Sequence, residues 1–404
     1  LKDEGNIEKL QDLETNETGI PRRADFSNDA KEERLGWLSK IKNLELDHLK
    51  GKYADTERLK GNIEHYIGMS QVPTGISGPI KVNGQFAKGN FYVPFATTEG
   101  ALVASVNRGM SIISKSGGGN VGVIEEQMTK APMFIFKNSG EAIKFNDWID
   151  KNYDKIKERA ESTTRYGKLI RIDKYLVGRR SILRMCYSCG DALGSNMITM
   201  ATQEACNFIK SNYEIEDYML QCNLEGEKKV SFLNFLTGRG KRVYADVTIP
   251  KNIVENFLHT TPERITTLAK NSSYGSMISG TIGANAHIAN ILTAIFIATG
   301  QDVAHVHDSS VGITSIDLNK DDSIYFSVNL PSLAVGTMGG GTGLGTQKEC
   351  LEIMGCYGSG KAKKFAEIVV ACVLAGEISL SGSQAAGDFA FAHDKFGRNR
   401  PDEK

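Results

Sequence analysis

The stretch APMFIF at residues 131–136 decides the fold, because this short apolar run opens a pattern that differs from the sequence on either side. A charged segment with helical periodicity follows at residues 140–163, then two apolar runs at 168–188, and then a second helical segment at 195–213. This succession predicts a strand, a helix, a β-hairpin and a helix, the order found in split βαβ units. We therefore predict an α+β protein in which residues 132–220 form a small inserted domain.

The segments flanking this insertion are predicted to form one larger domain from residues 61–131 and 221–404. Its predicted helices include residues 280–300, which are rich in alanine and glycine and so suited to close packing, and residues 363–382. The run KKVSFLNFL at residues 228–236 is predicted to be a strand. The charged residues 1–60 predict an N-terminal helical region.

The composition of the 404-residue chain excludes several function classes. It carries 48 basic and 48 acidic residues, so no net charge favours nucleic acid or an anionic membrane as a partner. No apolar run reaches the roughly 20 residues of a membrane-spanning helix, and the polar N-terminal segment lacks the pattern of a signal peptide. We therefore expect a soluble, cytoplasmic protein whose seven cysteines are reduced thiols.

Two local patterns resemble known binding motifs. The segment GCYGSGKA at residues 355–362 nearly matches a phosphate-binding loop, but alanine stands where that loop needs serine or threonine, which favours a turn at the end of a helix. Cys186 and Cys189 form a single CxxC pair on a predicted strand. Zinc would need further ligands, so buried thiols are the simpler interpretation.

Two further patterns concern metal ions and dinucleotides. His305 and His307 alternate as on one side of a strand; a metal would need Asp302 or Asp308 as a third ligand, and a polar surface is the simpler interpretation. The glycine-rich stretches SGGGN and GGGTGLG permit close backbone approach to a ligand. Neither has the spacing of a Rossmann motif after a strand, so any dinucleotide would be bound without that fold.

The stretch PFATTEGALVASVNRG at residues 94–109 contains a carboxylate whose role the local sequence leaves open. Thr97 or Thr98 can cap the helix that follows, and Glu99 in its first turn would face the positive end of the helix dipole. The same glutamate could instead be an acid used in catalysis, and the two roles can coexist.

The wider sequence resembles the 3-hydroxy-3-methylglutaryl-coenzyme A (HMG-CoA) reductase family. The resemblance lies in VPTGISGPI, PFATTEGALVASVNRG, MTKAP, GDALGSNMI, EKK, GANAHIANILTAIFIATGQD, GTMGGGTGLG and AGEISLSGSQAAG, in that order over residues 60–400. It implies a soluble prokaryotic or archaeal form of the class I type. The implied reaction is the NADPH-dependent four-electron reduction of HMG-CoA to mevalonate and coenzyme A in isoprenoid biosynthesis.

The resemblance also implies four catalytic residues. Lys228 would hold the carbonyl oxygen that becomes negative when hydride arrives. Glu99, close to Asp302 and Lys228, would donate a proton, with a pKa raised by burial and the neighbouring carboxylate. His393 would protonate the departing coenzyme A thiolate.

Binding residues are implied in the same way, and no metal ligand is among them. The residues implied for the substrate carboxylate and the coenzyme A side are Lys130, Lys229, Lys270, Ser105, Asn107, Arg108, His287 and Asn290. Those implied for the cofactor NADPH are Arg165, Asp191, Asn196, Gly339, Gly340, Gly341 and Arg398. Of these, Arg165 is expected to meet a 2′-phosphate, which favours NADPH over NADH.

The family fold implies a large domain around a long central helix and a small ferredoxin-like domain that binds NADPH. It also implies active sites between subunits, and hence a homodimer or higher homo-oligomer with HMG-CoA, mevalonate and coenzyme A as ligands. The chain departs from the family pattern at Lys130, Gln221, Glu227 and Ala392, where relatives carry arginine, serine, aspartate and serine. The alternatives are an NADH-dependent or mevalonate-degrading enzyme of the same fold, or a non-redox protein that binds coenzyme A.

Overall fold

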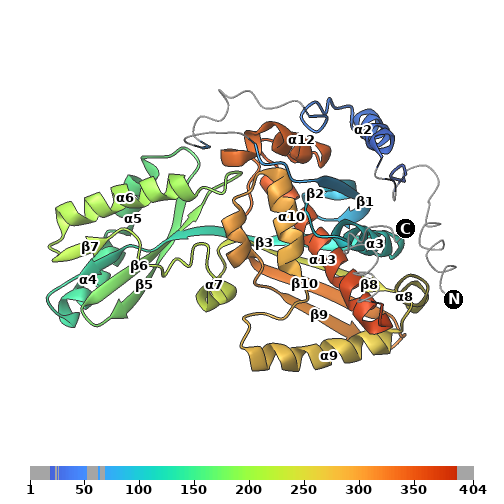
Figure 1. Cartoon of the computed structure of the whole chain (residues 1–404). Helices are drawn as coiled ribbons and strands as arrows, with labels where there is room; N and C mark the ends of the chain where they lie inside the picture. Colours follow the sequence, from blue (N-terminus) through green and yellow to red (C-terminus); the bar gives the residue numbers. More distant parts are fainter. Residues whose placement is uncertain (1–18, 23–24, 26, 52–61, 64–68, 389–404) are drawn as a thin grey trace.

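The fold is built on two sheets that share one long strand (Figure 1). The computed structural model describes residues 19–22, 25, 27–51, 62–63 and 69–388. Strand β3 (Gly119–Lys130) pairs with β8 (Gly240–Ile249) in the larger sheet, and its last residues pair with β6 (Arg180–Ser188) in the smaller one. This continuous strand joins the two parts of a mixed α+β fold, as the sequence predicted.

The larger sheet has the strand order β2-β1-β3-β8-β10-β9. Neighbouring strands are antiparallel except for β1 and β3, which are parallel. The remaining strands are β1 (Thr74–Asn83), β2 (Lys88–Ala96), β9 (Ile313–Leu318) and β10 (Ile324–Leu333). Helices α3 (Leu102–Lys115), α10 (Ile288–Thr299) and α13 (Ala362–Ala386) cover this sheet and complete its apolar core (Figure 1).

Helix α13 is the core helix of this part of the molecule. Among the described helices it alone has the length and apolar character to cross a membrane, but 94% of its most apolar window is buried inside the protein. It packs against strands β3, β8 and β10 and against α3. At the crossing with α3, a Cβ atom on Gly109 would lie 1.8 Å from the carbonyl oxygen of Ala375, so the two helix backbones touch where only glycine fits.

The smaller sheet has the strand order β7-β4-β6-β5, and all its neighbouring pairs are antiparallel. Its other strands are β4 (Met133–Ile135), β5 (Lys168–Val177) and β7 (Asp217–Met219), and its helices are α4 (Ser139–Lys151), α5 (Tyr153–Glu161) and α6 (Ser195–Asn212). Phe134, Phe145, Ile156, Leu183 and Ile198 belong to an apolar core that is distinct from the larger one. This core is supplied by one continuous piece of chain.

The other described helices lie around the larger sheet (Figure 1). They are α2 (Asn28–Lys42), α7 (Phe232–Thr237), α8 (Lys251–Leu258), α9 (Pro262–Ser279), α11 (Val306–Ser309) and α12 (Gly345–Ile353), with 3-10 turns η2 (Val303–His305) and η3 (Gly340–Gly343).

Three buried glutamates hold the larger part together over long sequence separations. Glu349 in α12, and Glu367 and Glu377 in α13, each accept hydrogen bonds from two or more main-chain N–H groups at distances of 2.6–3.3 Å. The main-chain donors to Glu349 are His48 and Leu49. The main-chain donors to Glu367 include Phe86 and Ala87. The main-chain donors to Glu377 are Ala286 and His287. Burial raises the pKa of Glu367 despite these bonds.

The predictions for residues 280–300 and 228–236 were wrong. The predicted helix at residues 280–300 is helical only over Ile288–Thr299, because the preceding residues form an irregular segment whose N–H groups bond to Glu377. The predicted strand at residues 228–236 is a loop followed by α7, and the side chain of Ser231 caps that helix. A short apolar run fits either a strand or a helix turn, and here the cap decides.

The segment at residues 355–362 is a turn between α12 and α13, as predicted. The N-terminus of α13 is already paired with a carboxylate. Asp191 accepts hydrogen bonds from the N–H groups of Gly360 at 2.6 Å and Ala362 at 3.1 Å. Partial burial acts to raise the pKa of Asp191, but these bonds hold it below its ordinary value.

Candidate active site

Lys228 and Asp302 form an ion pair at the surface of the larger domain. Lys228 Nζ lies 2.6 Å from Asp302 Oδ2, and both side chains are about two-fifths exposed. Asp302 follows α10 and accepts a hydrogen bond from the N–H of Ala304 at 3.1 Å. Partial burial acts to raise the pKa of Asp302, but Lys228 and this N–H hold it below its ordinary value. Asp302 is therefore a carboxylate at neutral pH, and it holds the lysine ammonium in place.

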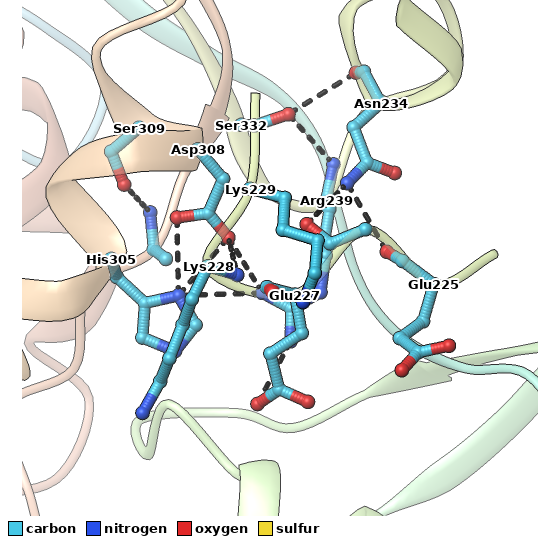
Figure 2. Close-up of polar contacts among 12 residues, drawn as sticks. Glu225, Glu227, Lys228, Lys229, Asn234, Arg239, His305, Asp308, Ser309 and Ser332 are labelled. Carbon is cyan, nitrogen blue, oxygen red and sulfur yellow. Dashed lines mark hydrogen bonds and ion pairs between the residues drawn. The ribbon is translucent and has the colours of Figure 1, made fainter. Parts of the chain in front are cut away.

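The backbone of Lys228 is held in a left-handed conformation, with φ of +57°. Its N–H lies 3.3 Å from Asp308 Oδ2. The preceding residues are fixed by Asn234 in α7, whose side-chain N–H groups donate to the carbonyls of Glu225 at 3.1 Å and Gly226 at 3.2 Å (Figure 2). Non-glycine residues seldom adopt positive φ, so this conformation of Lys228 needs support from its surroundings. The contacts with Asp308 and Asn234 fix the loop in this conformation and aim the ammonium at Asp302.

A buried network of charges lies beneath this loop (Figure 2). Arg239, fully buried, lies 2.9 Å from Asp308 and 3.3 Å from Glu227. Glu227 also accepts a hydrogen bond from Lys130 Nζ at 2.7 Å. Burial acts to raise the pKa of Glu227, but Lys130 and Arg239 overcome it and lower the pKa to about 2. Lys130 is 3% exposed and forms an ion pair with Glu227. The lysine expected to meet the substrate carboxylate is therefore paired with a carboxylate of the protein itself.

Replacing Glu227 by glutamine is expected to destabilise the fold at neutral pH by about 2 kcal/mol. The folded-state pKa of about 2 lies below the ordinary 4.5, so the carboxylate adds stability above about pH 4.5, and that stability is lost as the pH falls towards 2. Urea unfolding of both proteins at neutral pH and near pH 3 measures this, with Glu255→Gln on the exposed face of α8 as the control. An equal difference at both pH values would contradict it.

Glu99 lies outside the Lys228–Asp302 pair within one chain. The predicted helix cap was also wrong: α3 begins at Leu102 after Ala101, and Thr97 Oγ1 accepts instead from the N–H of Glu99 at 3.0 Å. The exposed Glu99 carboxylate accepts two hydrogen bonds from Asn290 at 2.9 and 3.0 Å. Asn290 lies near the start of α10 and Asp302 beyond its end, roughly 14 Å of helix apart. Among the described residues, no ion pair joins Glu99 to Lys228.

The residues expected on the coenzyme A side gather along α13. The hydroxyls of Ser105 and Ser379 lie 2.9 Å apart. Arg108 donates to the Ser379 hydroxyl at 3.0 Å and to the Ser379 carbonyl at 2.7 Å. Burial lowers the pKa of Arg108. His287 Nδ1 lies 3.2 Å from Glu377 in the same helix. Asn107 belongs to the same group, and its side-chain oxygen accepts from the N–H of Gly78 at 2.9 Å. Lys229 and Lys270, expected at the substrate carboxylate, are exposed.

The residues expected at the cofactor are compatible with a dinucleotide. Gly339 and Gly340 are exposed, have φ of +78° and +54°, and have open space where a Cβ atom would stand, so a ligand can approach their backbone. Gly341 packs closely on Gly300, where a Cβ atom would lie 2.8 Å from the carbonyl oxygen. Arg165 and Asn196 are exposed on the smaller domain, whereas the Asp191 carboxylate faces the start of α13.

Several other predicted features have a clear outcome. His393 and Arg398 lie outside the described residues. The strand predicted for His305 and His307 was wrong, because residues 303–309 are helical turns that bury the first histidine and expose the second. Cys186 and Cys189 are buried thiols at the end of β6, as predicted. Within the described ranges, no group of three or more His, Cys, Asp or Glu side chains has an arrangement that could hold a metal ion.

The buried part of the site was not found from the sequence. Arg239 and Asp308 carry no motif that distinguishes them from surface charges, and Asn234 lies in a run predicted to be a strand. Their contacts join segments about 70 to 100 residues apart, which local patterns do not encode.

Comparison with known proteins places this chain among oxidoreductases. A solved structure titled as the class II HMG-CoA reductase from Streptococcus pneumoniae bound to NADPH has the same fold, with a TM-score of 0.70 and 18% identity over 87% of this chain and 96% of that one. The family model described as hydroxymethylglutaryl-coenzyme A reductase matches residues 30–398. The chain belongs to that family.

Curated relatives agree with the family model. The chain is 50% identical to the HMG-CoA reductase of Methanocaldococcus jannaschii over 91% of this chain and 93% of that one. It is 45% identical to the reductase of Methanothermobacter thermautotrophicus, over 90% and 92%. It is 40% identical to the reductase of Strongylocentrotus purpuratus over 83% of this chain, which corresponds to 37% of that longer protein.

Proposed function

We propose that the Lys228–Asp302 pair is the reacting centre of an HMG-CoA reductase. As a member of this family, the chain reduces HMG-CoA to mevalonate and coenzyme A with NADPH. The observation that carries the proposal is the ammonium of Lys228 held 2.6 Å from Asp302 by a strained loop. The reaction turns a thioester into an alcohol by way of a hemithioacetal and an aldehyde, and each reduction places negative charge on a carbonyl oxygen. A fixed cation is the group that stabilises such a charge.

Lys228 binds the carbonyl oxygen in each half of the reaction, and Asp302 orients the ammonium before the substrate binds. Glu99 is the proposed proton donor to that oxygen, and His393 is the proposed donor to the coenzyme A thiolate. Lys229 and Lys270 are proposed to meet the free carboxylate of the substrate. The resemblance gives Lys130 the same role, which would require Lys130 to leave Glu227. Ser105, Asn107, Arg108, His287 and Asn290 are proposed to line the coenzyme A side.

A homodimer is the proposed functional unit. Within one chain Glu99 and Lys228 have separate partners, so a second copy is needed to bring a glutamate to the lysine. Exposed apolar side chains suited to such an interface lie on α9 and α7: Tyr274, Met277, Ile278, Phe232 and Leu236 are 54–89% exposed. Exposed apolar residues of this kind are common in subunit contacts.

The smaller domain is proposed to be ferredoxin-like, with boundaries at residues 132–220, and to bind NADPH together with the larger domain at 61–131 and 221–404. The strand order β7-β4-β6-β5, all antiparallel, supports this topology. NADPH, when bound, supplies the hydride. The residues proposed to hold it are Arg165, Asp191, Asn196, Gly339, Gly340, Gly341 and Arg398.

The chain is further proposed to be a cytoplasmic enzyme of the class I type. The chain is 40% identical to the sea urchin reductase but only 18% identical to the class II reductase of known structure. The lower identity to the class II protein supports the class I assignment. The burial of α13 inside the protein is consistent with a domain that acts in water.

Replacing Glu99 by glutamine is expected to lower kcat by about 100- to 10,000-fold, because glutamine keeps the contact with Asn290 but has no proton to donate. The measurement is the loss of reduced-nicotinamide absorbance with HMG-CoA, with NADPH and NADH run in parallel and Glu255→Gln as the control. Two NADPH consumed per HMG-CoA by the unmodified protein confirm the reaction. A fully active Glu99→Gln variant would remove Glu99 from the mechanism, and a preference for NADH would remove the role given to Arg165.

A further inference from the structure

His305 is a buried imidazole that the proposed mechanism does not use. It lies in η2, three residues after Asp302, and is fully buried. Its Nδ1 lies 3.0 and 3.1 Å from the two carboxylate oxygens of Asp308 (Figure 2). Its Nε2 is buried, has no hydrogen-bond partner, and lies 4.0 Å from Asp302 Oδ2. A buried ring nitrogen without a partner is costly, so it needs an explanation.

The geometry fixes the tautomer of this ring. An unprotonated Nδ1 would turn its lone pair toward the Asp308 carboxylate, so Nδ1 carries the proton and donates it there. In the neutral imidazole, Nε2 then presents a lone pair toward Asp302. When Nε2 gains a proton, it becomes a donor aimed at the carboxylate that also holds Lys228.

The two carboxylates that flank His305 also hold both ends of Lys228. Asp308 accepts from the main-chain N–H of Lys228, and Asp302 pairs with its ammonium. The charged groups that face the imidazole are Asp302 in its own turn, Asp308 in α11 and Arg239 at the start of β8, whose Nη1 lies 3.5 Å from Nδ1. Beyond Arg239 lie Glu227 and Lys130.

The formal charges of this cluster are balanced. Three cations (Lys130, Lys228 and Arg239) face three carboxylates (Glu227, Asp302 and Asp308). An anionic substrate that draws Lys228 towards its carbonyl oxygen leaves Asp302 without its partner. A proton on Nε2 of His305 restores a donor to Asp302 from the buried side.

We propose that His305 is a positioning residue that serves as the alternative partner of Asp302, holding that carboxylate while Lys228 engages the substrate. This inference rests on the proposed function of the Lys228–Asp302 pair. It differs from a purely structural role because it requires Nε2 to exchange a proton with solvent as Lys228 changes partner.

His305→Gln is the sharpest test, because glutamine keeps an N–H donor for Asp308 but does not titrate. We expect kcat to fall about tenfold and KM for HMG-CoA to stay within about threefold. The dependence of log kcat on pH should change shape, because the variant has no imidazole at this position. The matched control is His307→Gln, because that exposed histidine lies only two residues further along the chain and should leave rate and profile unchanged. An unchanged profile shape in His305→Gln, with loss of stability alone, would overturn the proposal.

A second measurement needs neither turnover nor a variant at position 305. In the ¹⁵N-histidine spectrum of the unmodified protein without ligands, one slowly exchanging imidazole should carry its proton on Nδ1. Adding HMG-CoA without NADPH should favour the doubly protonated ring. A buried ring protonated only at Nε2 would overturn the proposal, even if HMG-CoA reduction is confirmed. Absence of reduction by the unmodified protein would instead remove the proposed function.

Discussion

Replacing Lys228 by asparagine is expected to lower kcat by about 100- to 1000-fold, the usual cost of removing one group that stabilises an oxyanion. KM for HMG-CoA should stay within about threefold, because the ammonium acts on charge that develops only in the transition state. Asparagine is the informative replacement, since it tolerates the positive φ of +57° that Lys228 adopts. The loop should therefore keep its shape, and the lost activity reports the lost cation. Steady-state kinetics with HMG-CoA and NADPH measure both constants.

The matched control is Lys251→Asn at the start of α8. Lys251 forms an exposed ion pair with Asp322 at 3.2 Å, with exposure similar to that of the Lys228–Asp302 pair, but it lies away from the site. We expect the control to be fully active, because exposed ion pairs contribute little to stability. A Lys228→Asn protein that keeps a tenth or more of the activity would contradict the role proposed for this lysine. Thermal unfolding of both variants shows whether either change disturbs the fold.

Replacing Gly109 by alanine is expected to destabilise the larger domain by about 3 kcal/mol or more. The added Cβ atom would lie 1.8 Å from the carbonyl oxygen of Ala375, which is backbone and cannot rotate away. Helices α3 and α13 must separate to admit it, and overpacking of this kind costs about 1–3 kcal/mol even where side chains can adjust. The lower midpoint in urea or thermal unfolding measures the effect. Activity should fall as well, because Ser105 and Arg108 of α3 contact α13 near this crossing.

Gly36→Ala is the control for this change. Gly36 lies inside α2, is exposed, and has nothing within 4 Å of the position that a Cβ atom would take. Alanine should therefore stabilise that helix by about 0.5–1 kcal/mol, because glycine is the poorer helix former. Opposite signs for the two glycines are the expected result. A Gly109→Ala protein as stable as the unmodified one would show that the two helices do not touch as described.

Periodicity predicted much of the fold. The change from period-two runs to helical runs after residue 131 predicted β5, β6 and α6, because these elements are long enough to display their period. The single helix predicted at residues 140–163 is divided into α4 and α5, and the three-residue strand β7 was not predicted. It failed for Phe232–Thr237 and for residues 303–309, where one or two turns of helix are too short to show any period. His305 was therefore expected at the surface, although it is buried.

The site divides in the same way. Glu99, Lys228 and Asp302 were predicted as site residues because they belong to motifs shared with a family, and only the family membership is confirmed. Glu99 was expected beside Lys228, but within one chain its carboxylate accepts hydrogen bonds from Asn290 instead. The partners that aim Lys228, namely Asn234 and Asp308, come from distant segments, and no local pattern reveals which distant residues will meet.

The three buried glutamates also determine which parts of the chain can fold before synthesis is finished. The segment from Met128 to Leu220 supplies its own core, so it can fold as soon as it leaves the ribosome. The hairpin of β1 and β2 cannot, because its turn is closed by Glu367, which is made about 280 residues later. The segment around His48 waits still longer for Glu349, 301 residues downstream. The insertion therefore folds first, and the domain that surrounds it closes only when nearly the whole chain has been translated.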